Sequence, residues 1–232
     1  MSESNLPAQI EKLSWAAERK WVAEINNLEK RMAPLMRKAG RKYGYKYSGM
    51  HEFKCIGDFS AIADYCVSGF GQEKEVHVSY DMKTLGIDNQ YWALTGHPEW
   101  IPKYNAMRVS FFYSISSWKI GDEDFLMPDE TDAGLEALCE QIMRRTSEFH
   151  EQYIASVGGT KEGFYKTVLE AERRVGEDSN LRQFIALDMG DFALAEQLAL
   201  ETYQKRGHGI DIELAEYCRR KMQEESENTP TP

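Results

Sequence analysis

The chain has 232 residues and a formal net charge of −10, with 38 Asp and Glu residues against 28 Lys and Arg residues. Its hydrophobic content of 42% supports a folded core. An acidic surface repels phosphate backbones, so this balance argues against nucleic-acid binding and favours a basic protein partner. No apolar run approaches the roughly 18 residues of a membrane span, and residues 1–7 do not read as a secretory signal. We therefore expect a cytoplasmic protein with no membrane partner.

Apolar residues that recur every three or four positions predict an amphipathic helix near the N-terminus. Pro34 should kink or interrupt this helix, because proline removes a backbone donor. A basic cluster of Arg37, Lys38, Arg41 and Lys42 follows, and we expect it to solvate the helix end or to pair with the acidic tail. The apolar stripe consists of Ile10, Leu13, Ala17, Trp21, Ile25, Leu28, Met32 and Leu35 or Met36.

Residues 43–127 contain 17 of the 27 aromatic residues and read as strands. Turn residues recur without a helical stretch long enough for a crossover, which predicts an antiparallel meander. Val76–Tyr80 alternates apolar with polar residues, which places His77 on the opposite, solvated face of its strand. A short helical turn is predicted at residues 85–90. The other strand candidates are Phe53–Ile56, Ala61–Phe70, the short segment Gln90–Leu94 and the clearest one, Met107–Ile115, which Trp118 and Ile120 extend.

From Asp129 onward the apolar period is helical again. Thr160, either Ser179 or Asn180, and Asp191 are each placed to cap a helix. The tail from residue 226 is polar and expected to be disordered. The predicted fold class is therefore α+β, with a central antiparallel sheet between a long N-terminal helix and a C-terminal helical region. We expect an α+β domain over residues 1–157, a helical extension over 158–225 and a disordered tail over 226–232. The expected helices cover residues 135–157, 160–176, 181–189, 192–205 and 211–222.

The sequence contains no motif that indicates a catalytic, metal or cofactor site. The five histidines lack the spacing of a zinc site, and GxSxG, GxGxxG and phosphate-binding loops are absent. The four cysteines are widely separated and read as buried, reduced thiols. A catalytic site assembled from distant residues would be invisible here, so an enzyme remains the third hypothesis.

The best candidate for a binding surface is a run of acids that follows the predicted sheet. Helix capping and the helix dipole explain part of this run, and a partner-facing patch edged by exposed aromatic residues explains the remainder. The spacing does not match a calcium loop. The candidate partner-binding residues are Trp118, Asp122, Glu123, Asp124, Phe125, Asp129, Glu130 and Asp132.

Gly190, Phe192, Ala195 and Ala199 form a G-x-F-x-x-A-x-x-x-A pattern, which resembles part of a tetratricopeptide repeat. A solenoid needs about three copies, and no second copy is present, so a helical hairpin is favoured. A scaffold whose helices over residues 160–222 hold a peptide in a groove is the alternative function.

The overall layout resembles the immunity proteins of bacterial polymorphic-toxin and contact-dependent inhibition systems. The resemblance covers residues 5–205 and is carried by the order of elements, by the Gly44–Tyr47 segment before the sheet and by the "ALDMGDFALAEQLAL" segment in the tail. It implies a cytosolic protein that is not an enzyme and that binds and blocks a cognate toxin domain. The acidic balance agrees with a basic toxin as partner, while the oligomeric state stays open.

Overall fold

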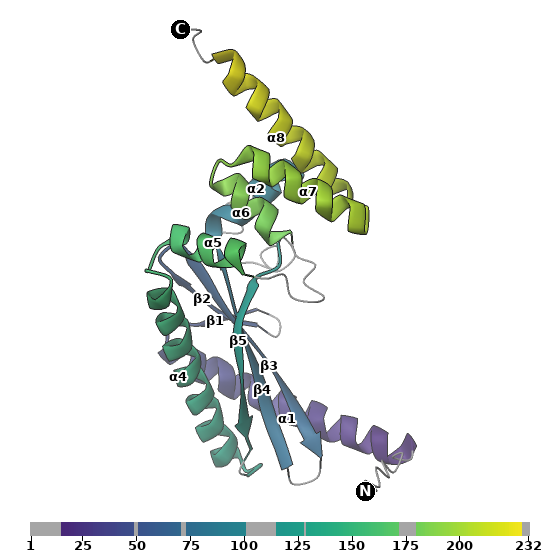
Figure 1. Ribbon diagram of the computed structural model, residues 1–232. Helices are drawn as coiled ribbons and strands as arrows, with labels where there is room; N and C mark the ends of the chain where they lie inside the picture. The colour runs from purple at the N-terminus through teal and green to yellow at the C-terminus, as the bar shows by residue number, and fades with distance from the viewer. Residues whose placement is uncertain are drawn as a thin grey trace, which may run out of the picture.

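The computed structural model describes residues 15–48, 51–70, 73–100, 115–127, 129–171 and 180–228. The fold is α+β, with an N-terminal helix, an antiparallel meander and C-terminal helices (Figure 1). The strands are β1 (Lys46–Ser48), β2 (His51–Ile56), β3 (Phe59–Phe70), β4 (Glu73–Thr84) and β5 (Trp118–Leu126). The helices are α1 (Trp15–Lys42), α2 (Leu85–Leu94), the short 3-10 helix η1 (Pro98–Trp100), α4 (Asp132–Ser156), α5 (Lys161–Glu170), α6 (Leu181–Asp188), α7 (Phe192–Arg206) and α8 (Gly209–Asn228).

The five strands pair in chain order, β1-β2-β3-β4-β5, and every neighbouring pair is antiparallel. The predictions for Phe53–Ile56, Ala61–Phe70 and Val76–Tyr80 are confirmed, since these segments lie in β2, β3 and β4. Side chains alternate between the two faces of a strand, so the register assigns each residue to a face. One face is apolar and carries Val76, Val78 and Tyr80, all fully buried.

Helices α1 and α4 cover this apolar face. Their apolar stripes, which include Met32 and Met36 of α1 and Ile142 and Met143 of α4, form one core cluster with the inward residues of β3, β4 and β5. The two helices also pair by charge: Lys38 Nζ lies 2.6 Å from Glu136 Oε1. Arg31 pairs with Asp132, and Lys42 with Glu140. Lys38 and Lys42 of the basic cluster therefore pair with α4 rather than with the acidic tail, while Arg37 lies over the Tyr47 ring.

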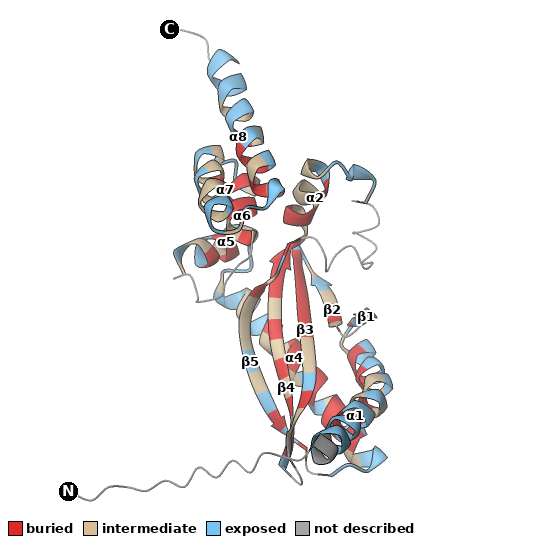
Figure 2. Cartoon of the chain, turned by 90° about the vertical axis from the view of Figure 1, so that its right-hand side faces the viewer, coloured by how far each residue is buried: buried red, intermediate tan, exposed pale blue. Residues whose placement is uncertain are grey.

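The remaining helices gather at the end of the sheet where β4 stops, and in Figure 1 α8 projects furthest from the strands. They share a second core cluster with Phe59, Met82 and Trp118 of the sheet. Figure 2 shows that β3 and β4 are largely buried, while the far part of α8 is exposed. Two predicted caps are confirmed: Thr160 accepts a hydrogen bond from Gly163 N, and Asp191 accepts one from Leu194 N.

Several sequence predictions differ from the structure. Gln90–Leu94 is part of helix α2 and not a strand, because Ile87, Asp88 and Trp92 are buried at helical spacing, a pattern that so short a segment does not distinguish from a strand. Pro34 does not interrupt α1, whose stripe is buried on both sides of it. Helix α8 continues to Asn228, into the tail expected to be disordered. The predicted strand Met107–Ile115 lies outside the described residues except for Ile115.

Gly121 of β5 makes the closest approach between the sheet and α4. A Cβ atom added at Gly121 would lie 2.6 Å from Cζ of Phe149, and that ring is stacked on Tyr80 with centroids 4.3 Å apart. Because the added methyl group must displace the Phe149 ring from its stack on Tyr80, we expect Gly121→Ala to lower the free energy of unfolding by about 1–3 kcal/mol, as overpacking does. Urea denaturation measures this loss. Gly209→Ala, where the added Cβ meets nothing within 4 Å, is the control and should change stability by less than about 0.5 kcal/mol.

Candidate partner-binding face

The acidic run of β5 is divided between the two faces of the sheet. Glu123 and Phe125 alternate with Asp122 and Asp124, and the register pairs Glu123 with buried Val78 and Phe125 with buried Val76. Glu123 and Phe125 therefore point toward α4, whereas Asp122 and Asp124 point away from it. The sequence grouped these residues into one patch, but the structure brings only Asp122 and Asp124 together.

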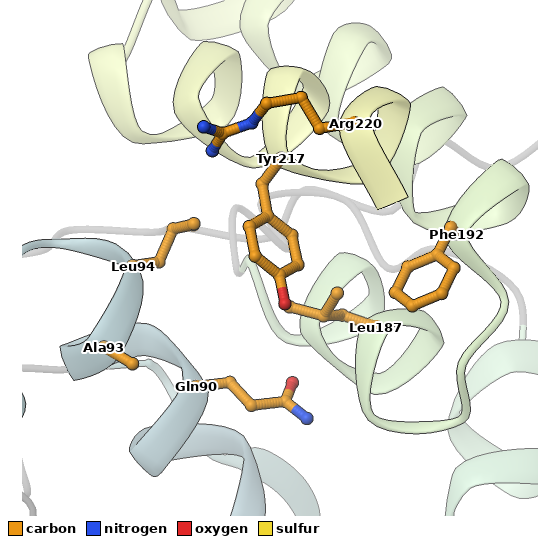
Figure 3. Close-up of a pocket in the computed structure, with 7 residues that line it drawn as sticks. All are labelled: Gln90, Ala93, Leu94, Leu187, Phe192, Tyr217 and Arg220. Carbon is orange, nitrogen blue, oxygen red and sulfur yellow. The ribbon is translucent and has the colours of Figure 1, made fainter. Parts of the chain in front are cut away.

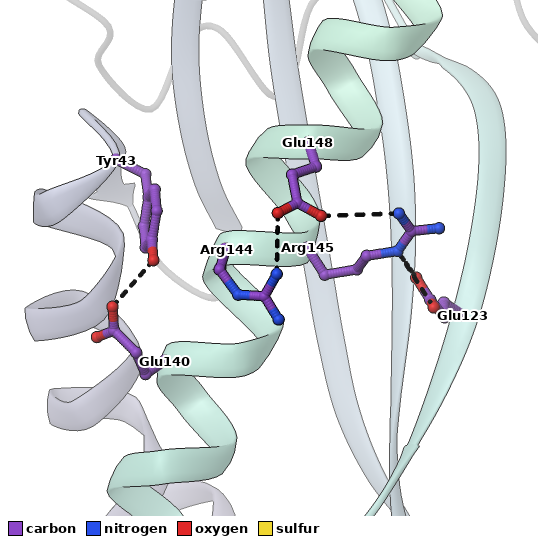
Figure 4. A network of polar contacts seen from close by, with 6 residues as sticks. All are labelled: Tyr43, Glu123, Glu140, Arg144, Arg145 and Glu148. Carbon is purple, nitrogen blue, oxygen red and sulfur yellow. Dashed lines mark hydrogen bonds and ion pairs between the residues drawn. The ribbon is translucent and has the colours of Figure 1, made fainter.

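The inward residues are held within the fold. Arg145 of α4 donates to Glu123 at 2.9 Å, and it also lies 3.8 Å from Glu148, as Figure 4 shows. Phe125 and Trp118 are each only 6% exposed. The expectation that these two aromatic residues edge an exposed patch is therefore wrong. Their size favours burial, and both sit in the core clusters on the covered side of the sheet.

The acids that precede α4 have local partners. Asp129 Oδ1 accepts from Thr131 N at 2.5 Å, and Asp132 is bound by Arg31. Glu130 pairs with Lys74, whose side chain is nearly buried. Capping of the helix start and pairing with other elements thus account for these three predicted residues, which lie apart from Asp122 and Asp124.

The outward face of β3, β4 and β5 collects carboxylates from three strands. The register places Asp64, Ser79 and Asp122 in one row across the sheet, and Cys66, His77 and Asp124 in the next. A third row consists of Ser68, Glu75 and Leu126. We call these three rows, together with His51 beside Asp64, the acidic sheet face.

The acidic sheet face is accessible and carries net negative charge. The side chains of Asp64, Asp122 and Asp124 are 44 to 59% exposed. His51 pairs with Asp64, His77 Nδ1 lies 2.7 Å from Asp124 Oδ1, and Lys119 pairs with Asp122. Apart from the two histidines, the face carries the carboxylates of Asp64, Glu75, Asp122 and Asp124, and Lys119 pairs with one of them.

Leu126 lies on the same face and is 76% exposed, the most exposed of the large hydrophobic residues that the structure describes. A single exposed leucine needs no explanation by itself. Here, however, it shares its row with Glu75 and adjoins Asp124. An apolar side chain within a charged rim is the usual composition of an interface centre.

The described residues offer little else for chemistry. Among them no three His, Cys, Asp or Glu side chains are placed to hold a metal ion. Buried His150 receives a hydrogen bond from Tyr45 Oη at 2.8 Å and donates to Ile62 O at 3.1 Å. Burial lowers the pKa of His150 to about 4, so it is neutral at pH 7 and structural. Cys139 and Cys218 are buried as expected, but Cys55 and Cys66 are exposed.

The sequence pattern did not single out Asp64, Glu75 or Leu126 as site residues. That these three residues lie on one face of the sheet follows from the register of β3, β4 and β5, which cannot be read from a single sequence. The signal that existed was the alternation around His77, which correctly placed this residue on the solvent face of β4.

No protein-family model, curated protein or solved structure matches the chain. None of the helices in the described ranges is both long and apolar enough to cross a bilayer. Function is therefore argued from the geometry of the acidic sheet face.

Proposed function

We propose that this protein binds a basic protein partner through the acidic sheet face. The observation that carries the proposal is the set of three successive rows across β3, β4 and β5, each with a carboxylate, beside exposed Leu126. Such a face attracts a positively charged surface from a distance and offers an apolar contact at its end, where Leu126 closes β5. The layout resemblance suggests the kind of partner, a basic toxin domain that this protein blocks as an immunity protein.

Several features support binding at this face. Strand β5, one of the three strands of the acidic sheet face, is an edge of the sheet. Its charged side chains oppose hydrogen bonding of this edge to β5 of a second copy. Asp122 and Asp124 have partners on their own face, but exposed pairs contribute little stability, so a partner's Lys or Arg can replace these contacts. The acids are therefore available to a partner at small cost to the fold.

The test takes a basic protein encoded by a gene adjacent to that of this chain as the candidate partner and expresses it in bacterial cells with and without this protein. We expect co-expression to restore growth and the association rate to fall as salt rises. In Asp64→Asn/Asp122→Asn/Asp124→Asn, we expect association to slow by about tenfold at low salt, because steering by charge is lost. Stopped-flow fluorescence measures this rate.

The control removes the same charge elsewhere, in Glu162→Gln/Glu170→Gln/Glu216→Gln, whose side chains are exposed on α5 and α8. Its association rate should stay within about twofold of the wild type. Equal slowing in both triple variants would mean that net charge matters and the acidic sheet face does not. Absence of growth rescue would exclude the toxin-blocking role for that pair while leaving the binding test intact.

A further inference from the structure

A pocket of about 470 Å³ lies far from the acidic sheet face, between α2 and the C-terminal helices. Its volume falls within the roughly 300–1,000 Å³ of small-molecule sites. Five of its seven lining residues are apolar or aromatic. Figure 3 shows the Tyr217 ring extending from α8 between α2 on one side and α6 and α7 on the other. The lining residues are Gln90, Ala93, Leu94, Leu187, Phe192, Tyr217 and Arg220.

Gln90, which lines the pocket, belongs to a part-buried polar network. Asp188, at the end of α6, accepts hydrogen bonds from Gln90 Nε2 at 2.8 Å, from Tyr165 Oη at 2.7 Å and from Lys161 Nζ at 3.1 Å. These contacts join α2, α5 and α6 at one carboxylate. The hydrogen bond to Asp188 also orients the Gln90 amide, so the pocket is formed before any ligand arrives.

One charged side chain lines the pocket, and it is a cation. Arg220 lies three residues after Tyr217 on α8, so both side chains leave the same face of that helix. In Figure 3 the Arg220 side chain extends from α8 above the Tyr217 ring. A guanidinium binds a planar carboxylate through two parallel hydrogen bonds, and its single charge balances a single carboxylate.

We propose that this pocket binds a small monocarboxylic acid whose apolar body lies against Phe192, Leu187 and Leu94 while its carboxylate meets Arg220. The chemistry follows from the composition of the walls, since an uncharged apolar ligand would leave Arg220 unused and a polyanion would find one cation. This site is independent of the proposed binding of a protein partner. It lies in the helical region and shares no residue with the acidic sheet face.

The test titrates the full chain with phenylacetate, indole-3-acetate and octanoate, each compared with its methyl ester. Binding is measured by saturation-transfer NMR and calorimetry. We expect at least one acid to bind about tenfold more tightly than its ester, and Arg220→Gln to remove this difference. Ala93→Trp places a large side chain in the pocket from an exposed position on α2 and should abolish binding of acid and ester alike.

Two variants serve as matched controls. Arg219→Gln removes the neighbouring positive charge, which pairs with Glu196 and does not line the pocket. Ala155→Trp adds the same bulk at an exposed position on α4. Both should bind the acid as the wild type does. The proposal is overturned if none of the three acids binds up to about 10 mM, if acid and ester bind equally, or if Ala93→Trp binds unchanged. If Ala93→Trp does not fold, the proposal is still tested by comparing the acid with its methyl ester and the wild type with Arg220→Gln.

Discussion

Asp88→Asn is expected to lower the free energy of unfolding by about 3–5 kcal/mol at pH 7, because it leaves a buried charge without its counter-ion. Asp88 lies in the first turn of α2 on its buried side. Its Oδ1 accepts a hydrogen bond from Lys83 Nζ at 3.0 Å. Both side chains are at most 1% exposed. Lys83 Nζ also donates to Ile115 O at 2.8 Å, so the pair joins the end of β4, the start of α2 and the segment before β5.

The pH dependence of this variant separates loss of the charge pair from loss of packing. Burial lowers the pKa of Lys83, and Asp88 opposes that shift, so removing Asp88 lowers it further. A lysine with a lowered pKa in the fold binds fewer protons there than in the unfolded chain, so stability rises with pH. The difference in the free energy of unfolding between the wild type and Asp88→Asn should therefore become smaller between pH 7 and pH 10.

The double variant Lys83→Met/Asp88→Leu provides the control for Asp88→Asn. It removes both charges and, among the partners in the described ranges, leaves the Ile115 carbonyl without this donor, at a cost of about 1–3 kcal/mol. We expect it to be more stable than the single variant and to lack the rise in stability with pH. Chemical denaturation at several pH values measures both properties. A double variant no more stable than Asp88→Asn would contradict the assignment of the loss to an unpaired charge.

Glu52→Gln is expected to stabilise the protein above pH 7. Glu52 of β2 is 1% exposed, and neither carboxyl oxygen has a hydrogen-bond partner within the described part of the chain. The backbone of α1 passes directly over it, since a Cβ added at Gly40 would lie 3.0 Å from Glu52 Oε2. Burial raises the pKa of Glu52 to about 7 from an ordinary value of 4.5, against the opposing effect of Arg37 and Arg41.

The direction of the effect follows from proton binding. Below pH 4.5 Glu52 is protonated in both states and contributes nothing, whereas between pH 4.5 and 7 the unfolded chain ionises first and the fold loses stability. The loss is complete above about pH 8 and amounts to about 3 kcal/mol, at ~1.4 kcal/mol per pKa unit. Glu52→Gln should therefore match the wild type near pH 4 and exceed it by up to about 3 kcal/mol at pH 8.

Differences between two proteins measured at each pH cancel the contribution of every other titrating group, including His150. Thermal and urea denaturation of wild type and Glu52→Gln from pH 4 to pH 9 give these differences. Glu151→Gln removes an exposed acid on α4 and is the matched control, with a difference below about 1 kcal/mol at all pH values. A constant difference between Glu52→Gln and the wild type would show that ionisation of Glu52 is not the cause.

Local patterns were enough to predict the layers of the fold. Alternation along β4 and the helical period of α1 and α4 report burial directly, because burial of one face selects apolar residues at that spacing. The prediction of a strand at Gln90–Leu94 was wrong because five residues are too few to distinguish the strand period of 2 residues from the helix period of 3.6. Residues such as Lys83, Asp88 and Glu52 escaped notice because a buried charge looks like a surface charge in the sequence.

The candidate site was predictable only in part. Asp122 and Asp124 were named from the sequence, and the structure keeps both on the accessible face. Phe125 was expected to be exposed but is buried, and its neighbour Leu126 is exposed instead. The face that each residue occupies depends on the register with β4. Asp64 lies nearly sixty residues earlier in the chain, and the pairing of β3 with β4 and of β4 with β5 places it in one row with Asp122, across Ser79.

The pairing of α1 with α4 also has a consequence for the synthesis of the protein. The ion pairs between the two helices join residues 98 to 101 positions apart, with the whole sheet between them. During translation at about 5–20 residues per second, the apolar stripe of α1 therefore waits roughly 5–20 s for its partner helix. In that interval β3 can cover only part of α1, where Trp21 donates a hydrogen bond to Gly69 and Glu29 accepts one from Val67, so the late emergence of α4 is the step that completes the first core.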